Sequence, residues 1–151
     1  MMFQSHVLLG VLLFIVFKGL FFGGNEVVFF FLVMLGSILP DIDSQHSKVN
    51  RWSGIFGVVI AFFFKHRGVF HSLPIYLGLF FLMREWIGVY YASGLFLGYL
   101  AHIIGDGISK EGVKPFYPFS FFHFRGPMRV GGWLEKIIFV VMFGLIVWQF
   151  T

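Results

Sequence analysis

Apolar residues gather in six runs along the chain, and glycine, proline or charged residues separate one run from the next. The runs cover residues 7–22, 27–39, 54–64, 73–92, 94–105 and 134–150. Each run predicts a helix, although a bilayer core about 30 Å thick needs about 20 helical residues and several runs are shorter. The shortest, 54–64, is typical of a re-entrant or interfacial segment. The turn between the fourth and fifth runs has two candidates, Arg84-Glu85 and Ala92-Ser93-Gly94.

This pattern predicts an all-α fold, a polytopic membrane helix bundle with about five spans plus one short re-entrant or interfacial helix. Composition supports a lipid environment, because 58% of the residues are hydrophobic and only 12% are charged. A soluble domain is about half apolar and about a quarter charged. Residues 107–133 are rich in glycine and proline and predict a long loop. We expect residues 1–151 to form a single membrane-embedded domain.

The charged residues predict the orientation of this bundle. If the first run crosses the membrane and 54–64 does not, the N-terminus and the C-terminus lie on opposite faces. Most lysines and arginines then share the face of the N-terminus, which the positive-inside rule identifies as cytoplasmic. The formal net charge of +4 therefore reports topology and anionic headgroups, and we expect no nucleic-acid partner.

The same count of crossings brings histidines and aspartates to the cytoplasmic face. His102 and Asp106 are four residues apart, so one helical face presents an imidazole and a carboxylate. Asp41 and Asp43 follow Pro40, which ends the preceding helix and predicts an extended turn. The alternative for each pair is structural: a His–Asp hydrogen bond at a helix end, or carboxylates that form a turn.

Two further histidines lie where helices begin. His6 is at the start of the first run, and His71 precedes Ser72, which we expect to cap the next helix. Ionisable groups near membrane depth are costly, so a cluster of them indicates a functional site. The predicted metal ligands are His6, Asp41, Asp43, His71, His102 and Asp106.

Three imidazoles and three carboxylates, in a chain without cysteine, suit zinc best, and manganese or iron would also fit. Six ligands are too many for one tetrahedral zinc ion that keeps a water, so we expect two ions that share a bridging carboxylate. Paired metal ions activate water and stabilise phosphoryl displacement. The spacing does not decide whether Asp41 or Asp43 is the main ligand.

Basic residues on the same face are of the types that bind phosphate. The predicted catalytic residues are Asp43, Arg67 and Arg125, and the predicted substrate-binding residues are Arg51, Lys114 and His66. The alternative for these cations is topological charge, and for Lys48 and Lys65 we prefer that interpretation.

A set of short motifs runs through most of the chain in a fixed order. It comprises His6, Leu39-Pro40-Asp41-Ile42-Asp43, His66-Arg67-Gly68, His71-Ser72, His102, Asp106 and Phe124-Arg125. In this set and order the chain resembles the YdjM-like family of inner-membrane metal-dependent hydrolases. The resemblance implies a small multi-helix membrane protein whose His and Asp residues bind metal.

That family is similar in turn to the zinc-dependent phospholipase C and P1 nuclease group. There, an HxxxD pair like His102 and Asp106, an upstream His like His71 and an Asp like Asp41 or Asp43 build a zinc cluster that hydrolyses phosphoesters. The chain departs from these patterns twice. Phe70 stands where the family often has threonine, and the His and Glu of a third zinc site have no counterpart, so a third metal is not expected.

We therefore expect an inner-membrane, metal-dependent hydrolase, a phosphoesterase that acts on a lipid or lipid-linked phosphate at the cytoplasmic face. The alternative is a non-catalytic membrane scaffold or partner-binding protein that a metal or a His–Asp network stabilises. An open coordination position beside a reachable pocket would distinguish the two. A cation transporter ranks last, because its ligands would lie near the bilayer midplane. The sequence does not set the oligomeric state.

Overall fold

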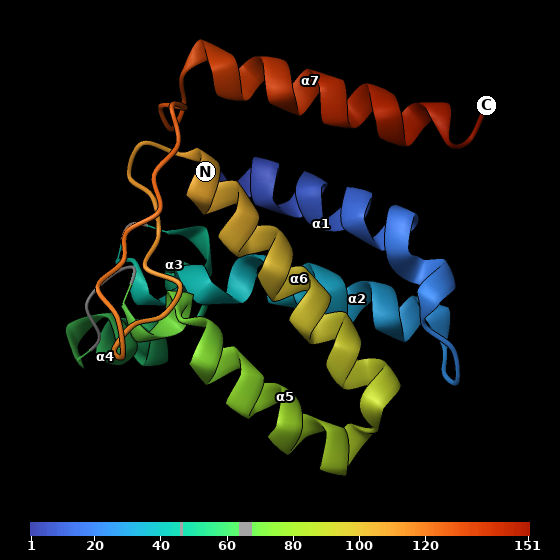
Figure 1. Cartoon of the computed structure of the whole chain (residues 1–151), viewed down its shortest axis with the longest axis horizontal. Helices are drawn as coiled ribbons and strands as arrows, with labels where there is room; N and C mark the ends of the chain where they lie inside the picture. Colours follow the sequence, from blue (N-terminus) through green and yellow to red (C-terminus); the bar gives the residue numbers. More distant parts are fainter. Residues whose placement is uncertain (46, 64–67) are drawn as a thin grey trace.

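The computed structural model describes residues 1–45, 47–63 and 68–151. Its α-helices are α1 (Phe3–Phe17), α2 (Glu26–Ile38), α3 (Lys48–Trp52), α4 (Ile55–Phe63), α5 (Leu73–Ile87), α6 (Val89–Ile108) and α7 (Trp133–Trp148). Three short 3-10 helices are η1 (Lys18–Leu20), η2 (Leu39–Asp43) and η3 (Val69–His71). Within the described ranges, β pairing is limited to two isolated bridges in the loop before α7. The predicted all-α fold is confirmed (Figure 1).

The helices follow the apolar runs, with one clear correction. The turn between α5 and α6 falls at Gly88, whose φ of 85° is a conformation that glycine adopts at no steric cost. Both predicted positions for this turn were therefore wrong. Helix α4 has nine residues, about half the length that a membrane span needs, in agreement with the short segment predicted there.

Fewer helices than predicted are both long enough and apolar enough to span a membrane. Among the described residues, only the segment Phe3–Leu20 is both long and apolar enough to cross a bilayer. Helices α2, α5 and α7 have 13, 15 and 16 residues, and at 1.5 Å per residue they are shorter than a core of about 30 Å. The expectation of about five spans thus goes further than helix length and composition support.

Helix α6 lies at the centre of the bundle, in contact with α1, α2 and α5 (Figure 1). Its contact with α2 is close because glycines face the neighbouring backbone. A Cβ atom on Gly98 would lie 2.0 Å from the carbonyl oxygen of Val33, and one on Gly36 would lie 2.1 Å from that of Leu95. Small residues let membrane helices pack at such short range. This contact fixes the position of α6 relative to the chain that follows α2.

We expect Gly98→Ala to lower the free energy of unfolding by about 1–3 kcal/mol, because the added methyl group forces α2 and α6 apart. Gly78→Ala on α5 is the matched control, since a Cβ there meets nothing within 4 Å. It should be neutral or stabilising, because alanine favours helix. Thermal unfolding in detergent, followed by far-UV circular dichroism, measures both. Equal stability of the two variants would contradict this account of the contact.

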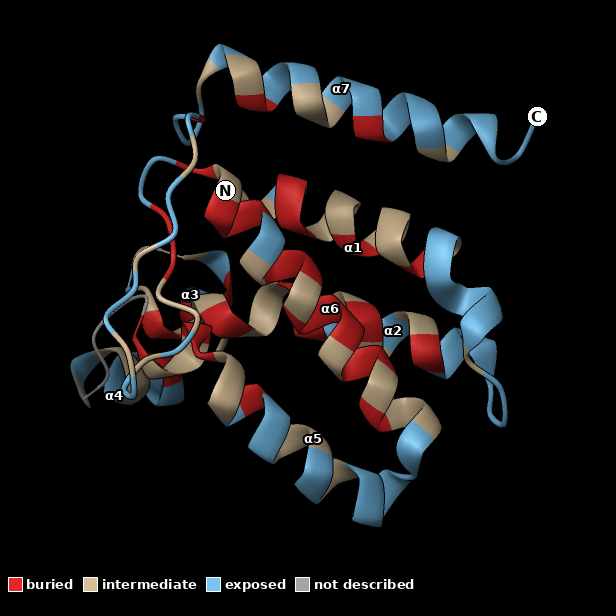
Figure 2. Ribbon diagram, viewed as in Figure 1, coloured by how far each residue is buried: buried red, intermediate tan, exposed pale blue. Residues whose placement is uncertain are grey.

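Buried residues gather on α6 and on the parts of α1, α2 and η2 that face it, whereas α7 is mostly exposed (Figure 2). Two side chains of α7 are buried, Glu135 and Met142. The carboxylate of Glu135 accepts hydrogen bonds from the backbone N–H groups of Met2 and Gly131, each at 2.7 Å. This buried carboxylate therefore ties the start of α7 to the start of α1.

Candidate metal centre

The short helix η2 carries Asp41 and Asp43 directly after α2. Pro40 ends α2, but the chain continues as a 3-10 helix and not as the extended turn that the sequence predicts. Asn50 holds this helix in place, because its side-chain N–H group donates to the carbonyl oxygens of Ile42 and Gly57, both at 2.6 Å. Sequence analysis missed Asn50, since an asparagine in a short polar segment carries no signal of a long-range role.

His71 is the last residue of η3, immediately before α5. Ser72 stands at the N-cap position but makes no side-chain capping hydrogen bond, contrary to expectation. Its hydroxyl instead donates to the carbonyl oxygen of Tyr117, and the N–H of Leu73 donates to Pro115 at 2.7 Å. The loop before α7 is therefore fastened to the segment that carries His71.

Helix α6 presents His102 and Asp106 one turn apart, as their spacing predicts. His102 Nε2 lies 3.9 Å from Asp106 Oδ2. Gly105, between them, leaves room for α1, since a Cβ there would lie 3.2 Å from Nδ1 of His6. His6 packs into this space, and its ring stacks on that of His102 with a centroid distance of 3.9 Å.

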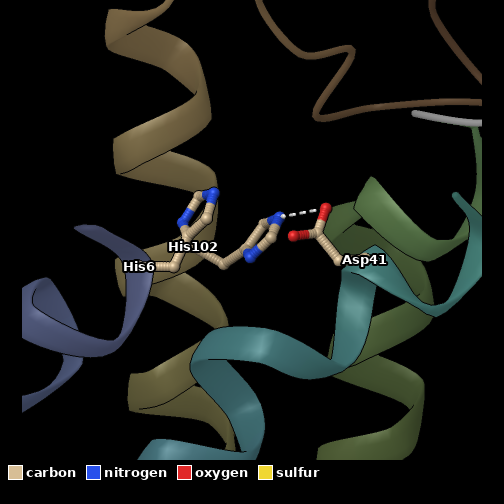
Figure 3. Close-up of side chains that lie close together, drawn as sticks. All are labelled: His6, Asp41 and His102. Carbon is tan, nitrogen blue, oxygen red and sulfur yellow. Dashed lines mark ion pairs between the residues drawn. The ribbon is translucent and has the colours of Figure 1, made fainter. Parts of the chain in front are cut away.

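The structure brings these side chains together as two overlapping triads. The Asp41 triad consists of His6, Asp41 and His102, and Figure 3 shows its members on α1, η2 and α6. The Asp106 triad consists of His71, His102 and Asp106. Within each triad the potential ligand atoms lie within 4.8 Å of one another. His102 belongs to both triads and links them.

Individual distances agree with a site of this size. His102 Nε2 lies 3.8 Å from Asp41 Oδ1, and His71 Nε2 lies 3.6 Å from Asp106 Oδ2. His6 Nε2 lies 3.3 Å from Asp106 Oδ1. Two atoms bound to one zinc ion at about 2.0–2.2 Å are within about 4 Å of each other. These side chains thus lie close to the separations that a bound ion imposes.

The protonation of His102 follows from its backbone partner. Nδ1 lies 2.8 Å from the carbonyl oxygen of Ser37, and because a carbonyl only accepts, Nδ1 carries the proton. The lone pair of Nε2 then points at Nε2 of His71, 3.2 Å away. A backbone carbonyl that fixes a histidine in this way is the usual outer partner of a metal-ligating imidazole. Ser37 was not singled out in the sequence, because its backbone and not its side chain acts.

Asp43 and Asp41 occupy different positions relative to the histidines. Asp43 is buried, and its Oδ2 lies 3.3 Å from Nδ1 of His71. With the proton on that nitrogen, the Nε2 lone pairs of His71 and His102 face each other, which requires a proton or a cation between them. Asp41 is 17% exposed and faces Nε2 of His102. The geometry therefore favours Asp41 as a ligand and Asp43 as the partner that orients His71.

Burial makes a cation in this cluster favourable. His6, His71, His102, Asp43 and Asp106 are each at most 2% exposed. Carboxylates buried together repel one another unless a positive charge offsets them. In the described part of the chain, neither ring nitrogen of His6 makes a hydrogen bond. An unsatisfied buried polar atom costs about 1–3 kcal/mol, and a metal ion bound through His6 would remove that cost. The donor set therefore fits a metal ion.

A pocket of about 350 Å³ opens beside the Asp41 triad. It is lined by Met1, Met2, Phe3, Gln4, Asp41, Ser44, Ser47, Lys48, Arg51 and Glu111. Asp41 thus belongs both to a triad and to a pocket wall, and Lys48 and Arg51 supply positive charge to the same pocket. The amino group of Met1 also lies 2.5 Å from Asp106 Oδ1.

The predicted phosphate-binding residues do not all share this pocket. Arg51 lines it, together with Lys48, which the sequence interpretation had set aside as topological charge. Arg125 lies on the loop before α7, where its Nε donates to His123 at 3.1 Å. Lys114 lies on the same loop and is partly buried. His66 and Arg67 lie outside the described residues.

These features define the class of protein: it is α-helical, with a candidate membrane span and a buried His/Asp cluster that could hold a metal ion. The sequence profile described as "YdjM inner membrane protein" matches residues 1–150, so the chain belongs to the YdjM inner membrane protein family. The predicted family is confirmed. Its description names a location in the inner membrane and no reaction.

Two relatives show how far the likeness extends. The inner membrane protein YdjM of Escherichia coli (strain K12) is 35% identical over 125 residues, which cover 77% of this chain and 63% of that protein. The uncharacterized protein YvsG of Bacillus subtilis (strain 168) is 32% identical over 107 residues, covering 69% and 66%. The chain thus spans slightly less than two thirds of each relative's length. No solved structure matches the chain.

Proposed function

We propose that the chain is a membrane-embedded, metal-dependent hydrolase, a phosphoesterase that acts on a lipid or lipid-linked phosphate. The observation that carries this proposal is that Asp41 belongs both to a His/Asp triad and to the wall of a pocket with two cations. A site that only stabilises a fold is closed, whereas a catalytic metal site keeps a position open to substrate.

The proposal gives each residue a distinct task. His6, Asp41, His71, His102 and Asp106 would hold one or two divalent ions, with zinc the best match to these nitrogen and oxygen donors. Divalent ions of this kind activate water and stabilise charge in phosphoryl displacement. The surrounding residues exclude bulk water, because the cluster is buried on every side but that of Asp41.

The pocket supplies the substrate contacts. Lys48 and Arg51 are exposed and line the same pocket as Asp41. An arginine can bind two phosphate oxygens at once, and a lysine adds a compact positive charge. Phe3 lies under Lys48, whose ammonium group is 5.1 Å from the ring centroid. The pocket therefore suits an anionic headgroup that approaches from the membrane surface.

We expect Arg51→Ala to reduce turnover of a phosphoester and to leave the metal content unchanged. A hydrogen bond to a charged group contributes about 1.5–3 kcal/mol, which corresponds to roughly a 10- to 100-fold loss in kcat/KM. Arg129→Ala is the matched control, because Arg129 is exposed but lines a different pocket. Steady-state kinetics and elemental analysis of both variants make the test. Equal losses in the two variants would place the substrate elsewhere.

The proposed function itself is tested by phosphate release from a panel of phospholipids, a polyprenyl phosphate and a soluble phosphodiester. The protein is supplied with zinc or manganese, its metal content is measured, and chelator serves as control. Turnover that depends on metal supports the hydrolase. A metal-replete protein that turns over no member of the panel would leave the scaffold as the better account.

One observation favours that alternative, a non-catalytic scaffold. Two of the histidines have partners within the protein that do not require a metal, since His102 Nδ1 lies 2.8 Å from the carbonyl oxygen of Ser37 and His71 Nδ1 lies 3.3 Å from Asp43 Oδ2. Such a network can hold α1, η2, η3 and α6 together with or without a metal. The scaffold predicts a large loss of stability on metal removal, and no dependence of any reaction on Arg51.

We also propose the five-span arrangement, in which α1, α2, α5, α6 and α7 cross the membrane and the cluster faces the cytoplasm. Helices of 13–16 residues can cross where the bilayer thins locally, at a cost of a fraction of a kcal/mol per Å of mismatch. Reporter fusions after Asn50 and Phe70 should both be cytoplasmic, and one after Thr151 should lie outside. Opposite sides for Asn50 and Phe70 would mean that α4 crosses and would contradict the shared face.

A further inference from the structure

The tip of the loop before α7 presents an exposed aromatic surface. Residues 115–122 read PFYPFSFF and contain no charged residue. Phe119, Phe121 and Phe122 are 82%, 73% and 59% exposed. Large aromatic side chains placed this openly on adjacent positions usually mark a contact with a membrane or another protein. We name residues 115–122 the aromatic tip.

Positive charge borders the aromatic tip at both ends. Lys114 precedes it, and Arg125 follows it three residues after Phe122. Arg125 is exposed, and its guanidinium group contacts the ring of His123. An apolar segment between cations is the pattern of a surface that inserts among anionic headgroups. A second copy of this chain would bring the same cations face to face, which is unfavourable.

The aromatic tip lies at one end of the candidate span. Within residues 1–45, 47–63 and 68–151, Phe3–Leu20 is the segment that is long and apolar enough to cross a membrane. In Figure 1 the loop runs along the end of the bundle at which α1 begins, α6 ends and α7 begins. The loop is therefore at the level where the span of α1 meets the membrane surface, which is the level of lipid headgroups.

Hydrogen bonds hold the aromatic tip in a defined shape and fasten it to the bundle. The N–H of Ser120 donates to the carbonyl oxygen of Phe116 at 2.9 Å, and the N–H of Phe122 donates to the Ser120 hydroxyl at 3.2 Å. The hydroxyl of Ser72 donates to Tyr117. The exposed rings are thus presented by a preorganised turn, which lowers the entropic cost of binding.

We propose that the aromatic tip inserts into the interface of a phospholipid bilayer and holds the His71–Ser72 segment at headgroup depth. The phenylalanine rings occupy the boundary between headgroups and acyl chains, and the flanking cations bind anionic headgroups. Insertion does not depend on hydrolysis. This proposal can therefore fail while the proposed function stands, and the reverse also holds.

The chain contains no cysteine, so single cysteines report on single sites. The experiment attaches a nitroxide spin label at Phe119→Cys, Phe121→Cys and Phe122→Cys in the full chain, reconstituted in vesicles of phosphatidylethanolamine and phosphatidylglycerol. Collision rates with oxygen, which concentrates in lipid, and with a water-soluble nickel complex give the depth of each label. Lys110→Cys is the matched control, an exposed position on the same loop outside the aromatic tip.

We expect oxygen to dominate at the three tip positions and nickel to dominate at position 110, with an oxygen-to-nickel ratio several-fold higher at the tip. A nickel-dominated label at all three tip positions would overturn the proposal, because the tip would then lie in water. Exclusion of both reagents together with dipolar broadening would also overturn it, because a second copy would then cover the tip. Three separate positions keep the test decisive if one variant fails to fold.

Discussion

Replacement of His102 by alanine is expected to remove almost all bound divalent metal, more than any other single change in the cluster. His102 belongs to both triads, so this change takes one ligand from each. Loss of an outer partner alone typically weakens metal binding about 10–100-fold, and loss of a shared ligand should cost more. Elemental analysis of the purified protein, with competition against a zinc-binding dye, measures the effect.

Three further variants separate loss of a ligand from loss of the fold. His6→Ala and Asp106→Ala each remove a member of one triad, so each should keep part of the metal. His123→Ala is a matched control, because His123 lies on the loop, where it contacts the carbonyl oxygen of Glu111. Thermal unfolding of metal-free samples checks that the variants fold. Unchanged metal in His102→Ala, or equal losses in all four variants, would contradict the two-triad interpretation.

Local sequence patterns predicted much of what positions the cluster. The spacing of His102 and Asp106 alone places them one turn apart on α6, because helical periodicity is a property of adjacent turns. Pro40 marked the end of α2 to within two residues, although Leu39 keeps right-handed helical angles, with φ of −57° and ψ of −39°, so the expected restriction of the residue before proline is not the cause. The class of fold followed from the apolar runs. These features need no knowledge of contacts between distant segments.

Features that depend on distant contacts were not predictable in this way. The tasks of Asp41 and Asp43 differ only because His102 approaches one and His71 approaches the other, from 61 and 28 residues further along the chain. Asn50 likewise acts through η2 and α4 together.

The boundary between α5 and α6 could not be predicted for a different reason. The apolar pattern is continuous across Gly88, so the turn there is visible only in its positive φ. Helix length and composition support fewer spans than the apolar runs suggest, because the turn at Gly88 shortens the run 73–92 to the 15 residues of α5. Polar residues such as His102 and Asp106 also lower the hydropathy of α6, which has the length of a span but not its composition.

The second large effect is expected at the two aspartates of η2, Asp41 and Asp43. Substitution by asparagine should act differently at each of them. Asp41→Asn removes a charged ligand that also faces the pocket, and an amide ligates metal poorly. Removal of one preorganised charged group from a reaction centre typically lowers kcat about 100- to 1000-fold. We therefore expect Asp41→Asn to abolish turnover within the sensitivity of a phosphate-release assay, and to weaken metal binding in the Asp41 triad.

Asp43→Asn should be milder, because the amide oxygen can take the place of the carboxylate oxygen that lies 3.3 Å from Nδ1 of His71 and is itself an acceptor. His71 would keep its orientation, with Nε2 still directed at the Asp106 triad. Asp43→Ala removes that acceptor and should weaken metal binding about 10- to 100-fold, as expected for loss of an outer partner. The three variants are compared by phosphate release and metal content. If Asp43→Asn proved as severe as Asp41→Asn, Asp43 would be a direct ligand, and the division of tasks between the two aspartates would be wrong.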